Sequence, residues 1–311
     1  MDKLTIFTGT SNTALARNIC KELKIDLGDL KVDNFTDGET RIKINENVRG
    51  KDVFIIQSTC SPANHNLMEL LIMIDATRRA SARRITAVLP YFGYARQDRK
   101  DQPRVPITAK LVANLITRAG ADRILTIDLH AGQIQGFFDV PLDHLYAVSI
   151  FVDYFKKKKL KDIVIVSPDV GGIKMARAYA KRFEGGLAIV DKRRISDTQA
   201  EAMHIMGDVK GKNVIIVDDI IATAGSIVEA ISALKKNGAK DIYAAISHPV
   251  LCGPAMERLK GANLKELVVT DTIPVSEEKK MANVTQLSVA SLLAEAIKRI
   301  HDEESVSALF E

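Results

Sequence analysis

Short apolar segments alternate with amphipathic segments along the whole chain, and this alternation restricts the possible folds most strongly. The apolar segments are rich in Val, Ile and Leu, and they cover Leu4–Phe7, Val53–Gln57, Ile85–Leu89, Ile124–Leu129, Ile163–Val166, Leu187–Val190, Val214–Val217, Ile242–Ile246 and Leu267–Thr270. Short runs that are apolar at almost every position are typical of parallel strands covered on both faces. The sequence therefore predicts an α/β fold with mostly parallel sheets flanked by helices.

Helical segments with recognisable ends lie between these strands. Ser61–Pro62 predicts the capped start of one helix, and Pro106 predicts the start of another, which Gly120 would end. A third helix is expected over Gly225–Asn237 and a final one over residues 289–301. The residues expected on the buried helix faces are Leu67, Leu70, Leu71 and Ile74; Ala109, Val112, Ala113 and Ile116; Ile227, Ala230, Ile231 and Leu234; and Val289, Leu292, Leu293, Ala296 and Ile300.

The length favours two domains, since 311 residues is about twice the size that one hydrophobic core usually serves. The best boundary lies near Asp143–Ala147, where a loop-like stretch follows Pro141. We therefore expect similar domains over residues 1–145 and 146–311, with the final helix returning to pack on the first.

The composition indicates a globular protein of the cytoplasm. No apolar run approaches the roughly 18 residues of a membrane span, and the N-terminus lacks the pattern of a signal peptide. Cys20, Cys60 and Cys252 are too far apart in sequence for a disulfide framework and fit a reducing compartment. The net charge of +5 is modest, and most of the positive charges are interleaved with acids, which argues against nucleic acid as a partner. A modest excess of Arg and Lys also suits a site for small phosphorylated substrates.

The segment Val214–Ser226 carries the strongest chemical signal. An apolar strand ends in two adjacent carboxylates, Asp218 and Asp219, and a loop of small and hydroxyl residues then opens a helix. Backbone N–H groups in such a loop can surround a phosphate at the positive end of the helix dipole. The carboxylates can accept hydrogen bonds from sugar hydroxyls. This predicts a sugar-phosphate site, in preference to two acids that merely cap a helix.

Polar clusters follow other strands as well. Pro90–Lys100 combines aromatic faces, an amide and guanidinium groups that suit a nucleotide, whereas Asn34–Thr40 alone reads as an Asp-Gly turn between strands. Further clusters occur at His130–Phe138, Ser167–Gly172 and Asp191–Arg194. Because ligands bind at the carboxyl ends of strands in open α/β sheets, these clusters together predict a ligand-binding edge.

These motifs resemble known families. The segment Val214–Ser226 resembles the phosphoribosyl-diphosphate loop of the phosphoribosyltransferase superfamily, and alone it would suggest a type I phosphoribosyltransferase. Together with Phe35–Glu39, Tyr94–Lys100, Asp128–Ala131 and Ser167–Gly172 it resembles the ribose-phosphate diphosphokinase family, over essentially the whole chain. The match is best to the class that uses ATP, is activated by phosphate and is inhibited by ADP.

The resemblance implies a reaction and a set of site residues. Diphosphate would pass from ATP to the 1-hydroxyl of ribose 5-phosphate, with AMP as the leaving group and Mg²⁺ as cofactor. The residues implied for ATP are Phe35, Asp37, Glu39, Arg96, Gln97, Asp98 and Arg99. His130 and Asp169 would contact the metal, although magnesium prefers oxygen ligands and an imidazole ligand is unusual.

The remaining implied residues concern the sugar and the transferring group. Lys192 and Arg194 would be catalytic, on a loop that closes over the transferring group and stabilises developing charge. Asp218 and Asp219 would bind the ribose hydroxyls. The 5-phosphate would lie against the backbone of Ala222, Thr223, Ala224, Gly225 and Ser226.

The phosphate loop departs from the family pattern at two positions. Ala222 stands where the family usually has Asp, and Ser226 stands where it usually has Thr. Serine keeps the hydroxyl, so that change is mild. Ala222 removes a carboxylate beside the sugar, and an effect on ribose 5-phosphate affinity or metal use would show whether that carboxylate matters.

The family also implies assembly and regulation. A homo-oligomer, commonly a hexamer, with an allosteric nucleotide site at subunit interfaces is expected, and Arg49, Ser81, Arg104 and Asp143 lie in segments where that site would be sought.

Three alternatives remain open. One is a phosphoribosyltransferase proper, which leaves the motifs near Phe35 and Arg96 without a role. Another is a catalytically silent regulatory relative. A nucleic-acid-binding protein is suggested only by the positive charge.

Overall fold

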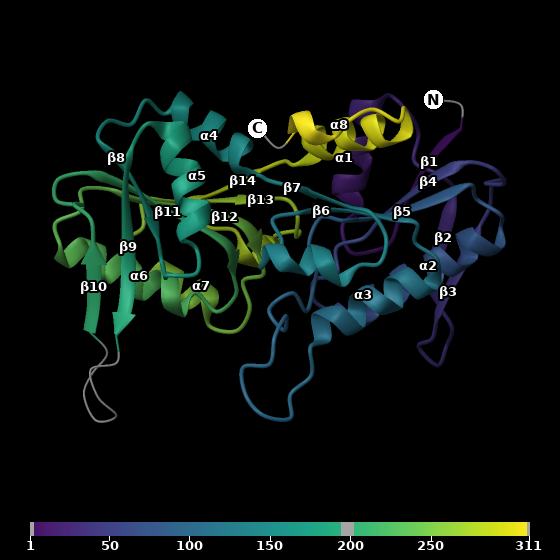
Figure 1. Ribbon diagram of the computed structural model, residues 1–311, viewed down its shortest axis with the longest axis horizontal. Coiled ribbons are helices and arrows are strands. Elements are labelled where there is room, and N and C mark those ends of the chain that lie inside the picture. Colours follow the sequence, from purple (N-terminus) through teal and green to yellow (C-terminus); the bar gives the residue numbers. More distant parts are fainter. Residues whose placement is uncertain (1–2, 194–201, 310–311) are drawn as a thin grey trace. The chain divides into compact units, whose positions relative to one another are not determined.

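The computed structural model describes residues 3–193 and 202–309 (Figure 1). The chain divides into two compact units, which are described separately. The first comprises Met1–Tyr146, Thr272–Pro274 and Ser288–Glu311, and the second comprises Ala147–Asp271 and Val275–Leu287. The chain thus passes from the first unit to the second at Tyr146–Ala147, and residues 288–311 lie with the first unit.

The first unit is built on a five-stranded parallel sheet. Its strands follow the order β1 (Leu4–Thr8), β4 (Asp52–Ile56), β5 (Arg84–Leu89), β6 (Arg123–Ile127) and β7 (Leu142–Leu145). Figure 1 shows α1 (Thr13–Leu23) and α8 (Ala290–His301) on one face, and α2 (Ala63–Arg79) and α3 (Thr108–Ala119) on the other. An antiparallel hairpin, β2 (Leu30–Asn34) and β3 (Thr40–Ile44), and short 3-10 helices η1 (Gly132–Phe137) and η3 (Ser307–Leu309) complete it.

The second unit is built on a seven-stranded sheet. Its order is β10 (Ala202–Met206), β9 (Gly186–Arg193), β8 (Ile163–Ser167), β11 (Asn213–Ile221), β12 (Ile242–Pro249), β13 (Glu266–Thr270) and β14 (Val284–Leu287), and only β10 runs antiparallel to its neighbour. Helices α4 (Val148–Lys157) and α5 (Ile173–Phe183) cover one face, whereas α6 (Gly225–Lys236) and α7 (Ala255–Lys260) cover the other (Figure 1). A 3-10 turn, η2 (Glu277–Lys279), precedes β14.

The two units repeat one arrangement. The parallel series β1-β4-β5-β6-β7 of the first corresponds in order to β8-β11-β12-β13-β14 of the second. In each unit the chain forms an antiparallel pair, β2–β3 or β9–β10, after the first strand of the series and before the second. Both units therefore present loops after several parallel strands along one edge, which is where open α/β sheets bind ligands.

The predicted α/β fold class is confirmed. The residues at the centre of each predicted helix face are also buried, as expected. Leu70, Ile74, Val112 and Ile116 are almost fully buried in the first unit. In the second unit, Ile227, Ala230, Ile231 and Leu234 are also buried. These apolar stripes face sheets whose strands are apolar on both sides, as the sequence predicts.

The structure also differs from the sequence prediction in several places. The loop-like stretch after Pro141 is the parallel strand β7, whose Asp143 and His144 hid it from a search for apolar runs. Strands β10 and β14 were likewise not predicted, because each is short and carries polar residues, whereas β2 and β3 were implied only by the predicted Asp-Gly turn between strands. Ser61 does not cap α2, since Pro62 occupies the cap position without a side-chain hydrogen bond, and α3 begins at Thr108 rather than beside Pro106.

A buried charge cluster fixes α8 to the sheet of the first unit. The Asp52 side chain is fully buried, and its carboxylate accepts hydrogen bonds from Arg84 Nε at 2.9 Å and Nη2 at 2.5 Å. Arg84 Nη2 also donates to the Ile300 carbonyl at 2.7 Å, and His301 Nδ1 lies 2.9 Å from Asp52 Oδ2. The end of α8 is therefore tied to the starts of β4 and β5.

In residues 3–193 and 202–309, the helices are all too short or too polar to span a lipid bilayer.

Candidate active site

The end of β11 carries the acidic pair in a poorly solvated setting. Asp219 is buried and Asp218 is half-buried, and Asp218 Oδ1 accepts a hydrogen bond from the Asp219 N–H at 2.9 Å. Burial raises the pKa of Asp218 well above its usual value, and the nearby charges of Asp219 and Asp169 raise it further. Because the negative charge of Asp218 is costly in this setting, the carboxylate would be stabilised by binding a cation or hydrogen-bond donors such as sugar hydroxyls.

The loop after this pair turns sharply into α6. Ala224 precedes the helix with φ of 61°, in the left-handed region, and its side chain is buried. Gly225 is the first residue of α6, while the Thr223 and Ser226 side chains are exposed. The loop thus presents a helix N-terminus and two hydroxyls at the carboxyl edge of the sheet, which suits an anion.

Asp169 lies at the end of the neighbouring strand, β8. Its Oδ1 accepts a hydrogen bond from the Gly172 N–H at 3.0 Å, and its carbonyl accepts one from Ser167 Oγ at 2.6 Å. A side chain at position 172 would not fit, because its Cβ would lie 2.6 Å from Ser167 Oγ. Since β8 and β11 are adjacent and parallel, Asp169 shares one edge with the acidic pair of β11.

The two predicted catalytic cations fall at or beyond the limit of what the structure describes. The backbone of Lys192 belongs to β9, where it pairs with Met203 of β10. Arg194 lies outside the described residues.

The hairpin β2–β3 presents Phe35, Asp37 and Glu39 at its tip. Asp37 Oδ1 accepts a hydrogen bond from the Glu39 N–H at 3.1 Å, and Gly38 supplies the left-handed conformation of the turn with φ of 94°. The Phe35 ring is 48% exposed although it is large and apolar, and the Arg41 guanidinium lies 5.2 Å from its centroid. An exposed aromatic ring of this kind is suited to stacking on a base.

The segment after β5 is fixed in place by its polar side chains. Gln97 Oε1 accepts a hydrogen bond from Thr108 Oγ1 at 2.5 Å, and the Gln97 carbonyl accepts one from the Ala109 N–H at 3.1 Å. Asp98 Oδ2 accepts one from Gln133 Nε2 at 2.9 Å. In this structure Gln97 therefore satisfies the start of α3, a contact that the sequence prediction did not include.

Other side chains of the same segment differ in their exposure. Arg96 and Arg99 are exposed, and the Tyr94 hydroxyl hydrogen-bonds to Asn64. The two guanidinium groups are thus accessible to a ligand, while hydrogen bonds of Tyr94, Gln97 and Asp98 fix the segment that carries them.

His130 follows β6 and is exposed. The turn before it is held by His144 of β7, whose Nε2 accepts a hydrogen bond from the Leu129 N–H at 2.8 Å. Asp128 adopts a positive φ of 38° in this turn. His144 was missed in the sequence because a histidine in a short strand gives no sign of what it contacts.

The acidic and histidine side chains do not form a pre-assembled metal cage. Within the described part of the chain, no group of three or more His, Cys, Asp or Glu side chains is placed to hold a metal ion. His130 belongs to the first unit and Asp169 to the second.

The predicted regulatory residues are spread over the first unit. Arg49 and Ser81 lie close together, because the Gly50 N–H donates to the Ser81 carbonyl at 2.9 Å. Asp143 in β7 forms an ion pair with Arg123 at 2.5 Å. Arg104 lies in the exposed segment before α3 with φ of 65°.

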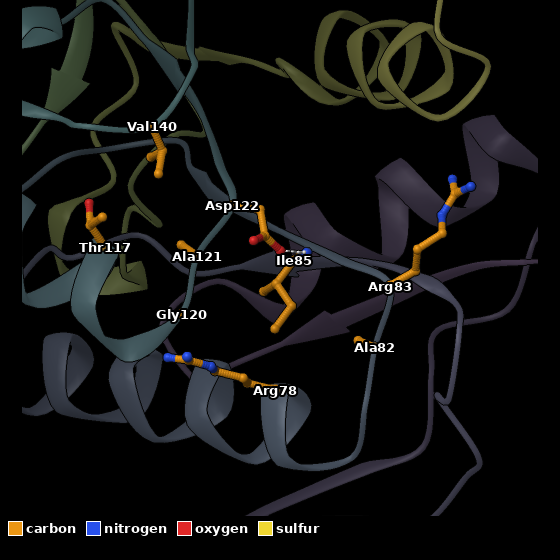
Figure 2. Close-up of a pocket in the computed structure, with 9 residues that line it drawn as sticks. All are labelled: Arg78, Ala82, Arg83, Ile85, Thr117, Gly120, Ala121, Asp122 and Val140. Atoms are coloured by element: carbon orange, nitrogen blue, oxygen red, sulfur yellow. Dashed lines mark hydrogen bonds between the residues drawn. The ribbon is translucent and has the colours of Figure 1, made fainter.

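A hollow of about 300 Å³ lies at the opposite, amino edge of the first sheet (Figure 2). Arg78, Thr117, Gly120, Asp122 and Val140 are among its lining residues. Figure 2 shows Asp122 turned toward Ile85, whose N–H donates to the carboxylate at 2.8 Å. The hollow is lined by residues at the starts of β5, β6 and β7. The predicted substrate residues of this unit lie elsewhere, on the β2–β3 hairpin and on the loops after β5 and β6, so we do not assign substrate binding or catalysis to the hollow.

Known proteins resemble this chain over nearly its full length. The family model for the N-terminal domain of ribose phosphate pyrophosphokinase matches residues 4–120, and the model for the phosphoribosyl synthetase-associated domain matches residues 192–311. The ribose-phosphate pyrophosphokinase of Campylobacter jejuni is 58% identical over 305 residues, covering 98% of each chain. That of Bacillus cereus is 57% identical over 307 residues, covering 99% of this chain and 97% of the relative.

A solved structure agrees with these sequence matches. The crystal structure of phosphoribosylpyrophosphate synthetase from Mycobacterium smegmatis has a TM-score of 0.92 at 42% identity, covering 97% of this chain and 99% of that one. The chain therefore belongs to the ribose-phosphate pyrophosphokinase family.

Proposed function

We propose that this protein transfers the diphosphate group of ATP to the 1-hydroxyl of ribose 5-phosphate. The products are 5-phosphoribosyl 1-diphosphate, a precursor for nucleotide biosynthesis, and AMP. The observation that carries this proposal is the end of β11, where two poorly solvated carboxylates precede a loop that opens α6. A sugar phosphate such as ribose 5-phosphate supplies both neighbouring hydroxyls for the carboxylates and a phosphate for the start of the helix.

The sugar phosphate is assigned to the second unit. Asp218 and Asp219 accept hydrogen bonds from the ribose hydroxyls, and the backbone of residues 222–226 binds the 5-phosphate at the start of α6. The raised pKa of Asp218 supports this role, because two donors from a sugar relieve the cost of its buried charge.

The nucleotide is assigned to residues of the first unit. Phe35 stacks on adenine from the hairpin tip, with Asp37 and Glu39 beside it, and its exposure supports that role. Arg96 and Arg99 hold phosphate through their exposed guanidinium groups, with Gln97 and Asp98 keeping the segment in position.

Magnesium suits the carboxylates at the end of β8 and β11. Asp169 presents oxygen ligands, which Mg²⁺ prefers, and His130 is the second assigned contact. When bound, the ion neutralises charge on the ATP phosphates. Lys192 and Arg194 are assigned to stabilise the charge that develops on the transferring group. The protein itself supplies alignment and charge, since phosphoryl chemistry requires no covalent step from the chain.

Assembly and regulation are part of the same proposal. The protein forms a homo-oligomer, a hexamer by family resemblance, in the cytoplasm. Inorganic phosphate activates it and ADP inhibits it through a site that includes Arg49, Ser81, Arg104 and Asp143. The proximity of Arg49 and Ser81 supports a shared role for these two residues.

A product assay tests the reaction. The protein is incubated with ATP, ribose 5-phosphate, Mg²⁺ and inorganic phosphate, and AMP is resolved from ADP. We expect AMP and the sugar diphosphate in equal amounts, and loss of both in the Lys192→Ala variant. Formation of ADP would mean a simple kinase, whereas nucleotide binding without turnover would mean a silent regulatory relative.

A further inference from the structure

The loop that precedes α6 is fixed by hydrogen bonds from the turn that follows β12 and from α7. Three successive carbonyls, from the last residue of β11 into the loop, are bound by this turn and by α7. Ile221 O accepts from Leu251 N of the turn at 3.0 Å, Ala222 O from Cys252 N of the turn at 2.9 Å, and Thr223 O from Arg258 Nη1 of α7 at 3.0 Å. All of these residues belong to the second unit. The turn and α7 together thus fix the direction of the carbonyls of residues 221–223.

The direction of the carbonyls fixes the direction of the amides. In a trans peptide the C=O of one residue and the N–H of the next point to opposite sides. The N–H groups of Thr223 and Ala224 therefore point away from the turn after β12. Successive N–H groups directed to one side form a concave surface that binds anions.

Backbone strain shows that this arrangement is imposed by its surroundings. Ala224 and Leu251 both adopt left-handed conformations, with φ of 61° and 46°, although neither is glycine. Such conformations persist only where neighbouring contacts over-determine them, and they concentrate at functional sites. The Leu251 side chain is 1% exposed, so the core anchors the turn that holds the loop.

Arg258 is the one side chain among these three donors. It extends from α7, and its Nη1 would lie 3.2 Å from a Cβ at Gly225, on the side of the loop that faces away from the Ala224 N–H. The Nη1 group therefore acts on the loop through the Thr223 carbonyl.

We propose that Arg258 is a positioning residue for ribose 5-phosphate, which holds the Thr223 carbonyl so that the loop amides meet the 5-phosphate. This inference rests on the proposed role of residues 222–226. Because the hydrogen bond is charge-assisted, its loss should matter more than that of a neutral contact. The effect should be specific to the sugar, since the nucleotide residues belong to the first unit.

Steady-state kinetics of the full-length enzyme test the proposal. In Arg258→Ala we expect the KM for ribose 5-phosphate to rise about tenfold, as for loss of one charge-assisted hydrogen bond. The KM for ATP and the melting temperature should stay near those of the wild type. Arg258→Lys should recover most of the affinity, because Lys retains a charged donor. Lys260→Ala is the matched control, since Lys260 is an exposed cation on the same helix.

A second variant separates this proposal from the proposed function. Thr223→Val removes a hydroxyl from the loop but keeps its backbone carbonyl. If Thr223→Val raises the KM for ribose 5-phosphate and Arg258→Ala does not, the loop assignment stands and the role of Arg258 is wrong. If neither variant changes that KM, the role of Arg258 is wrong and the Thr223 hydroxyl does not contact the sugar phosphate, and the product assay then decides separately whether the proposed function stands. Equal rises in both substrate KM values, with a lower melting temperature, would reduce Arg258 to a structural residue.

Discussion

At the scale of single residues, Asp218, which we propose binds the ribose hydroxyls, carries a charge that lowers the stability of the folded chain. Its carboxyl lies at the end of a buried strand beside a second acid, and burial is the largest cause of its raised pKa. Ionisation is therefore harder in the folded chain than in the unfolded one, so the wild type should lose stability as the pH rises from the ordinary Asp pKa of about 3.9.

Replacing this group should reveal that cost. We expect Asp218→Asn to raise the free energy of unfolding by roughly 1 kcal/mol at pH 8, and by less near pH 4, because Asn cannot ionise. Urea unfolding at several pH values would measure this, while the KM for ribose 5-phosphate should increase.

Asp208→Asn is a control of opposite sign. The hydrogen bond from Lys212 is the largest cause of the lowered pKa of Asp208, so that variant should gain no stability at high pH. A pH-independent difference between Asp218→Asn and the wild type would contradict the assignment of a raised pKa.

Ala222 is one of the two positions at which the resemblance implies a departure from the family pattern. Its half-buried side chain lies in the loop after Asp218 and Asp219. We expect Ala222→Asp to change the KM for ribose 5-phosphate or the Mg²⁺ concentration needed for half-maximal activity, because it adds negative charge beside the acidic pair. Ala222→Asn has the same size without the charge and serves as the control. If both kinetic quantities stay constant in Ala222→Asp, the departure has no functional consequence.

At the scale of elements, the buried Asp52 carboxylate joins α8 to β4 and β5. Removing it in Asp52→Ala leaves Arg84 without its buried partner, and should lower the free energy of unfolding by about 3 kcal/mol. Denaturant unfolding would measure the loss. Asp75→Ala is the control, because the Asp75–Arg79 pair of 2.7 Å is largely exposed and should contribute far less to stability than a buried pair. Equal effects of the two variants would mean that the Asp52 cluster adds little beyond a surface pair.

The elements also show what the sequence could predict. Central strands such as β5 and β11 were predicted because both of their faces are buried, so nearly every residue is apolar. Edge and hairpin strands such as β7 and β14 were missed because tertiary pairing, rather than composition, makes them strands. The Asp37-Gly38 turn was predicted correctly, because its chemistry is local.

The candidate site was predictable in part for the same reason. The acidic pair and the following loop are contiguous in the sequence, so their strand–loop–helix setting could be predicted and is confirmed. The contacts of Gln97 with Thr108 and of Arg258 with Thr223 could not be predicted, because the partners are separated in the sequence and no motif links them. The substrate roles of the site residues remain predictions.

At the scale of the whole molecule, the first unit depends on residues from the far end of the chain. Leu293, Ile297 and Ile300 of α8 are buried in that unit, and α8 lies beside α1 (Figure 1). Burying three such side chains contributes roughly 5 kcal/mol, which is comparable to the net stability of a domain. The unit should not keep its native packing without them.

A shortened chain tests this dependence. We expect a chain that stops at Leu287 to lose amide-exchange protection throughout β1, β4, β5 and β6, while β11 and β12 in the second unit stay protected. Hydrogen exchange with mass spectrometry would measure both units in one experiment. A chain that stops at Asp302 keeps α8 and should retain both patterns. Full protection of the first unit in the shorter chain would show that α8 is dispensable.

The placement of α8 also determines the order in which the protein can mature during its synthesis. Domains usually fold as they leave the ribosome, with the N-terminal one first. Here every strand of the second sheet has been translated before the first residue of α8 is made. The part of the protein that is translated first is therefore completed last, and until then the uncovered face of α1 is a surface that chaperones would have to protect.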